Sequence, residues 1–160
     1  MRILGVDPGL GRLGWGVIES EKQKVTVEAY GCIETSQKLS EEKRIQQVFD
    51  QLSQIIQEKN PEVLVVEELF FSKNVTTAFM VGQARGVVLL VAAQYNLSVV
   101  SYNPGEVKVA VTGYGKAEKK QVGQMVKAIL KLEKLPKLDD TTDALAIALT
   151  HAFSDKRKFA

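Results

Sequence analysis

The chain has 160 residues, of which 45% are hydrophobic and 25% charged, and its formal net charge is +2. These values describe an ordinary globular domain, with no apolar run of the roughly 18 residues that a membrane span needs. One cysteine and one histidine exclude a disulfide framework and a zinc cluster, and the N-terminus carries no signal-peptide pattern, so we expect a single cytoplasmic domain over residues 1–160.

The first part of the chain predicts strands. Three strand-like runs are joined by connections short enough for antiparallel hairpins. They cover residues 2–7, 13–19 and 24–35.

The remainder alternates helices with strands. Apolar residues at helical spacing predict helices at about 40–60, 75–95 and 116–132, a short helix opened by Asn103-Pro104, and a last helix after Pro136. Two β-branched runs at 62–68 and 97–102 predict strands. We expect an α/β fold, a mixed five-stranded sheet with helices on both faces, and a short basic tail from about residue 155.

In this order of elements the first and fourth strands become parallel neighbours, with their C-terminal ends side by side. Open α/β sheets bind their ligands at that edge. Asp7 ends the first of these strands and Glu67-Glu68 ends the fourth, while Asp140 and Asp143 open the last helix with the i, i+3 spacing of one face.

Each acid alone also has a structural interpretation: an Asx-turn for Asp7, a strand end reaching solvent for Glu67-Glu68, and helix capping for the acids of the last helix. Their convergence favours chemistry, because clustered carboxylates have raised pKa values or require a cation. Oxygen ligands suit Mg²⁺ or Mn²⁺, and a pair of such ions is the recurrent device for displacement at phosphorus.

Two further features indicate a phosphate backbone as ligand. The segment after Asp7, PGLGRLGWG, is rich in glycine, which we interpret as room for a phosphodiester chain to approach. Residues 108–137 carry eight lysines against two acidic residues, which predicts either a solvated helix face or a phosphate-binding stripe.

Five blocks in register carry a family resemblance across residues 1–151. They read VDPGLGRLGWGVIE, VEELFFSKN, GQARG, VKVAVTGYGKAEKKQV and DDTTDALAIALTH. Together they resemble the bacterial RuvC-type crossover junction endodeoxyribonucleases, the Holliday junction resolvases. The resemblance implies a ribonuclease H-like fold, a homodimer, and magnesium-dependent symmetric nicking of four-way DNA junctions during recombination and repair.

The family's catalytic, metal-binding acids fall on Asp7, Glu67, Asp140 and Asp143 of this chain. The resemblance implies two Mg²⁺ ions per active site, with Mn²⁺ as a substitute. Glu68 and Asp139 stay open as alternatives to their neighbours, although only Asp140 has the i, i+3 relation to Asp143.

Three further positions match DNA-contacting residues of the family: Phe70, which would stack on a base, and Lys108 and Lys119, near the scissile phosphate. Arg85 suits either a phosphate contact or, with Gly82 and Gly86, close helix packing that includes a dimer contact. The resemblance also implies a branch-migration helicase as partner and no membrane.

Three other functions fit parts of the pattern. The acid and glycines after the first strand also resemble the phosphate loop of the actin and sugar-kinase group. A different ribonuclease H-like nuclease, or a junction-binding module without catalysis, would use the same core.

Overall fold

The computed structural model describes residues 1–22, 24–69 and 74–158, with side chains through residue 154. One five-stranded sheet in the order β3-β2-β1-β4-β5 forms its centre. The strands are β1 (Arg2–Asp7), β2 (Arg12–Glu21), β3 (Lys24–Glu34), β4 (Val63–Glu67) and β5 (Ser98–Tyr102). The helices are α1 (Glu41–Lys59), α2 (Val75–Gln94), α3 (Pro104–Thr112), α4 (Lys119–Leu130) and α5 (Asp139–Lys158).

The sheet is mixed, as its sequence predicts. Strands β1, β2 and β3 form antiparallel hairpins, whereas β4 pairs in parallel with both β1 and β5. The predicted parallel neighbours, β1 and β4, are confirmed, and their register aligns Val6 with Val66. The C-terminal ends of these two strands therefore lie side by side.

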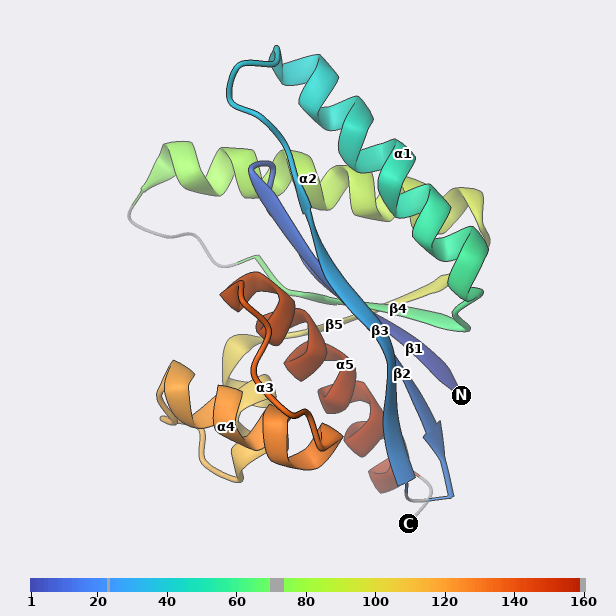
Figure 1. Cartoon of the computed structure of the whole chain (residues 1–160), viewed down its shortest axis with the longest axis vertical. Helices are drawn as coiled ribbons and strands as arrows, with labels where there is room; N and C mark the ends of the chain where they lie inside the picture. Colours follow the sequence, from blue (N-terminus) through green and yellow to red (C-terminus); the bar gives the residue numbers. More distant parts are fainter. Residues whose placement is uncertain (23, 70–73, 159–160) are drawn as a thin grey trace.

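Helices cover both faces of the sheet (Figure 1), with α1 and α2 on one side and α3, α4 and α5 on the other. Alternation along each strand divides the buried side chains between two cores. Ile3 and Val65 lie in the core under α3, α4 and α5, whereas Leu4 and Val66 lie in the core under α1 and α2. Odd-numbered residues of β1 and β4 thus point toward α5.

Helix α5 approaches the sheet closely because glycines lie beneath it. A Cβ on Gly5 would overlap the carbonyl oxygen of Ala144, and one on Gly14 would overlap that of Asp140. Gly9 has a different constraint, since a Cβ there would collide with the Arg12 carbonyl within the turn. The interpretation that the glycines make room for DNA is therefore wrong at two positions. Gly9 makes room for the turn before β2, and Gly14 makes room for α5.

Helix ends also differ slightly from expectation. The last helix continues to Lys158, past the predicted start of the basic tail at about residue 155, because lysine and arginine are good helix formers. Helix α4 begins at Lys119, where Glu118 and Gln121 form a reciprocal capping box. This cap fixes the position of Lys119 at the first turn of α4.

Candidate active site

Two acidic side chains end neighbouring parallel strands. Asp7 is the last residue of β1 and Glu67 the last of β4. Because side chains alternate along a strand, Asp7 shares a face with Ile3, and Glu67 shares one with Val65. Both carboxylates therefore lie on the face that α5 covers.

The start of α5 supplies two more acids. Gly14 pairs with Asp7 across the β1–β2 hairpin and lies against the backbone of Asp140. This contact places the first turn of α5 over the strand ends, with Asp143 one turn further along. The fold thus brings together acids from three distant parts of the sequence.

The carboxylates interact strongly with one another. Burial raises the pKa of Asp7 to about 8, and the negative charges of Asp143, Glu67 and Asp140 contribute to this rise against the opposing charge of Lys119. The pKa values of Glu67 and Asp143 are also raised, in both cases mainly by burial. The site therefore holds more negative charge than its own basic residues neutralise.

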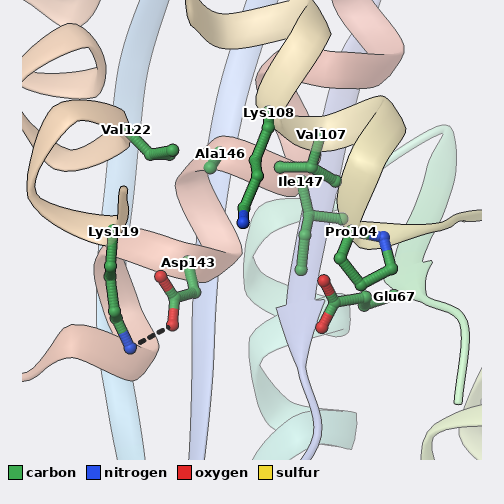
Figure 2. Close-up of a pocket in the computed structure, with 9 residues that line it drawn as sticks. All are labelled: Glu67, Pro104, Val107, Lys108, Lys119, Val122, Asp143, Ala146 and Ile147. Atoms are coloured by element: carbon green, nitrogen blue, oxygen red, sulfur yellow. Dashed lines mark ion pairs between the residues drawn. The ribbon is translucent and has the colours of Figure 1, made fainter. Parts of the chain in front are cut away.

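Both predicted lysines border the acids, in a hollow of about 280 Å³ (Figure 2). Lys119 Nζ lies 2.8 Å from Asp143 Oδ2 and 3.6 Å from Asp139 Oδ2. Burial alone would lower the pKa of Lys119, but its hydrogen bond to Asp143 and the surrounding acids raise it. The charge of Lys108 reaches the same hollow and favours the ionised form of Glu67. The lining residues are Glu67, Pro104, Val107, Lys108, Lys119, Val122, Asp143, Ala146 and Ile147.

The structure separates the alternative acids. Glu67 interacts with Asp7 and Asp143, whereas Glu68 is exposed beyond the strand end. The side chain of Asp139 is 79% exposed and that of Asp140 is 32% exposed. The geometry thus groups Glu67 and Asp140 with the other acids, whereas the more exposed Asp139 lies 3.6 Å from Lys119.

The other predicted DNA-contacting positions have different outcomes. Phe70 lies outside the described residues. Arg85 donates a hydrogen bond from Nη2 to Ser101 Oγ at 3.2 Å, so it joins α2 to β5. Among the described residues, a Cβ on Gly86 would meet no atom within 4 Å, and one on Gly82 would meet Leu69 alone, at 4.0 Å, so neither glycine packs closely against that part of the chain.

One residue near the acids has no counterpart among the sequence predictions. Arg12, the first residue of β2, places Nη1 3.7 Å from Asp140 Oδ2. The sequence does contain a signal for it: pairing of Asp7 with Gly14 in a tight hairpin puts Arg12 just beyond the same edge of the sheet.

The donor set suits a hard divalent cation. It consists of carboxylate oxygens, and burial together with the neighbouring negative charges raises the pKa of Asp7, an effect that a bound cation would oppose. Within residues 1–22, 24–69 and 74–154, no three Asp, Glu, His or Cys side chains form a metal-binding group as they stand. In the same site Lys119 pairs with Asp143, and Arg12 pairs with Asp140.

Comparison with known proteins places this chain in a family. The family model described as "Crossover junction endodeoxyribonuclease RuvC" matches residues 3–151. A protein of that name from Heliobacterium modesticaldum is 51% identical over 154 residues, which cover 96% of this chain and 95% of the relative. Another, from Brevibacillus brevis, is 49% identical over 95% of this chain and 92% of its own length.

Solved structures agree with this result. The structure described as "T. thermophilus RuvC in complex with Holliday junction substrate" superposes with a TM-score of 0.93 at 35% identity, covering 99% of this chain and 96% of that one. The yeast mitochondrial Holliday junction resolvase Ydc2 has a TM-score of 0.69 at 13% identity, over 99% of this chain and 82% of its own, which shows a shared fold.

The electrostatics predict how stability depends on pH in metal-free buffer. The pKa of Asp7 rises from 3.8 to about 8 on folding, so between these values the folded chain keeps a proton that the unfolded chain has lost. Raising the pH then favours unfolding. Replacing Asp7 with Asn removes this contribution, so the stability advantage of Asp7→Asn over the wild type should grow by up to about 4 kcal/mol from pH 5 to pH 8, at about 1.4 kcal/mol for each pH unit.

Urea unfolding in EDTA at several pH values measures this difference. Asp50→Asn, a change of an exposed acid on α1, is the matched control and should follow the wild-type pH dependence. Parallel stability curves for Asp7→Asn and the wild type would contradict the prediction.

Proposed function

Because the chain belongs to the RuvC family of crossover junction endodeoxyribonucleases, we propose that its carboxylate site cuts four-way DNA junctions by hydrolysing one phosphodiester bond in each of two opposed strands. The observation that carries this assignment is the convergence of Asp7, Glu67, Asp140 and Asp143 at one sheet edge beside Lys119. The chain is a nuclease, and junction DNA is its substrate.

Family membership implies dependence on a divalent metal ion. We assign that role to two Mg²⁺ ions, for which Mn²⁺ can substitute, held by Asp7, Glu67, Asp140 and Asp143. When bound, such ions supply an activated water molecule and stabilise the departing oxygen. Their charge would also offset the burial and the repulsion that together raise the pKa of Asp7.

The basic residues of the hollow orient the substrate. Lys108 and Lys119 come from different helices, α3 and α4, and both line the hollow that contains Glu67 and Asp143. Two cations at fixed positions can hold a phosphate and neutralise charge that develops on its oxygens. Lys119 is the closer to the acids, so it would exchange Asp143 for a phosphate oxygen when DNA binds.

Hydrolysis needs no covalent intermediate at this site. Within the described part of the chain, the residues lining the hollow include no serine, threonine, cysteine, histidine or tyrosine that could act as a nucleophile. Direct attack by water, with departure of the 3′ oxygen, leaves 5′-phosphate and 3′-hydroxyl ends. A ligase can seal such ends.

Paired cutting requires two active sites, and α2 offers a surface for a second copy. Val75, Phe79, Leu89 and Leu90 are exposed on this helix, Phe79 to 65%. Their spacing places them on one face, which also carries Gly82 and Gly86. A second α2 could approach closely there because Gly82 and Gly86 carry no side chains. We therefore propose that the protein is a homodimer joined through α2.

Helix α2 also corrects the expectation that the chain has no apolar run long enough to span a membrane. Its mean hydropathy is 1.6, so by length and composition it could cross a membrane, and 28% of that window is buried in the protomer. Its packed side, however, carries part of the sheet's core through Ala84, Val88 and Val91. The apolar outer face is therefore better explained by a dimer partner. Family membership further supports a helicase-type motor as a functional partner.

Cleavage of a synthetic four-way junction tests the proposed function most directly. With Mg²⁺, nicks should appear at symmetric positions on two opposed strands, and EDTA should abolish them. Asp7→Asn should reduce the rate at least about a thousandfold, because it removes a carboxylate that would hold the metal ions, while junction binding persists. Strand-by-strand mapping of end-labelled junctions gives the result.

Two adjacent glutamates provide the matched control. Glu67→Gln should lose cleavage as Asp7→Asn does, whereas Glu68→Gln, altered at an exposed side chain, should keep it. Undiminished cutting by Glu67→Gln would reject the assigned carboxylate set.

The dimer has its own test. Phe79→Glu places a charge on the exposed apolar face of α2, so sedimentation velocity should show a shift from dimer to monomer and symmetric cutting should be lost. Met125→Glu changes an apolar residue of α4 that is 39% exposed on the opposite side of the sheet from α2, and this variant should remain a dimer. A dimeric Phe79→Glu protein, or a monomeric wild type, would refute the proposed interface.

A further inference from the structure

A second hollow lies beside the carboxylates, on the side away from the lysines. Its volume is about 350 Å³, and its lining residues are Gly11, Arg12, Glu34, Thr35, Gln37 and Asp140. We call it the arginine hollow. It borders β2 and β3, whereas the hollow that contains Lys108 and Lys119 borders β4 and α3, so Asp7 on the central strand β1 lies between the two.

Among the described residues that line the arginine hollow, Arg12 is the one with a basic side chain. Its side chain is 55% exposed, and its contact with Asp140 Oδ2 is long, at 3.7 Å. In the β2–β3 ladder it stands opposite Glu34. An arginine held this loosely can turn toward an anion, and its planar guanidinium matches two phosphate oxygens at once.

The wall of the hollow is fixed by hydrogen bonds. Thr35 donates from Oγ1 to the Leu10 carbonyl at 2.5 Å and from its backbone N–H to the Gly11 carbonyl at 3.0 Å. Arg44 Nε donates to Thr35 Oγ1 at 3.0 Å. In the described part of the chain no carboxylate lies within ion-pair distance of Arg44, so its charge adds to that of Arg12.

We propose that the arginine hollow binds a phosphate of the cleaved strand that neighbours the scissile phosphate, with Arg12 making the contact. This inference rests on the proposed nuclease function. A strand with its scissile phosphate at Asp7 must continue in both directions. On one side it meets Lys108 and Lys119, and on the other it meets Arg12. Two separated phosphate contacts fix the register of the strand at the carboxylates.

The salt dependence of junction binding tests the contact. Each phosphate contact contributes about 0.7 (single strand) to 0.9 (duplex) to the slope of log affinity against log salt concentration. In EDTA, Arg12→Gln should therefore bind with a slope smaller by that amount, and Arg12→Lys should keep most of the wild-type slope. Lys24→Gln removes the same charge at the far end of the β2–β3 hairpin and should leave the slope unchanged. An unchanged slope for Arg12→Gln would mean that Arg12 only steadies Asp140, and would overturn the proposal.

Neutral methylphosphonate linkages locate the contacted phosphate. One linkage at a time is placed around the cut. At one position next to the scissile phosphate, the neutral linkage should weaken junction binding by the wild type but not by Arg12→Gln. Equal losses for both proteins at every position would also overturn the proposal. Cutting of unmodified junctions by the wild type with Mg²⁺ is measured alongside. If the proposed nuclease function fails, the wild type will bind the junction without nicking it, and this outcome does not depend on how Arg12→Gln binds.

Discussion

Repulsion between four carboxylates at one edge of the sheet is the constraint on which the site depends. Burial and these like charges together raise the pKa of Asp7 to about 8. The neighbouring cations respond to the same field, since Lys119 pairs with Asp143 and Arg12 with Asp140. These two cations flank the acids without neutralising them completely. The remaining negative potential is what makes the site suited to divalent ions, and through them to a phosphodiester.

The fold tolerates this repulsion because the acids belong to rigid elements. Asp7 and Glu67 end central strands with buried neighbours, and α5 is held over them by direct contact with the glycine backbone at Gly5 and Gly14. A side chain at either glycine would push α5 away and separate its two aspartates from the strand ends. Packing energy across the sheet thus offsets the electrostatic cost of bringing the charges together.

Much of this architecture was predictable from the sequence, because periodicity and turn residues define the elements and parallel pairing brings Asp7 beside Glu67. The glycine-rich segment was not, since a glycine has the same sequence signal whether a helix or a ligand approaches it; only the position of α5 explains Gly14. Arg12 was missed because its importance depends on a contact with Asp140, 128 positions away in the chain. Phe70 stays a prediction, because it lies outside the described residues.

Calorimetric titration of the protein with Mn²⁺ or Mg²⁺ tests the central claim, that these carboxylates form one cation-binding unit. Performed near pH 7.5 in buffers of different ionisation enthalpy, it reports both affinity and proton release. With the pKa of Asp7 near 8, metal binding should release about one proton per protomer. Asp7→Asn should bind the metal more weakly and release no proton. Metal uptake without proton release by the wild type, or undiminished affinity in Asp7→Asn, would contradict a single cation-binding unit built on Asp7.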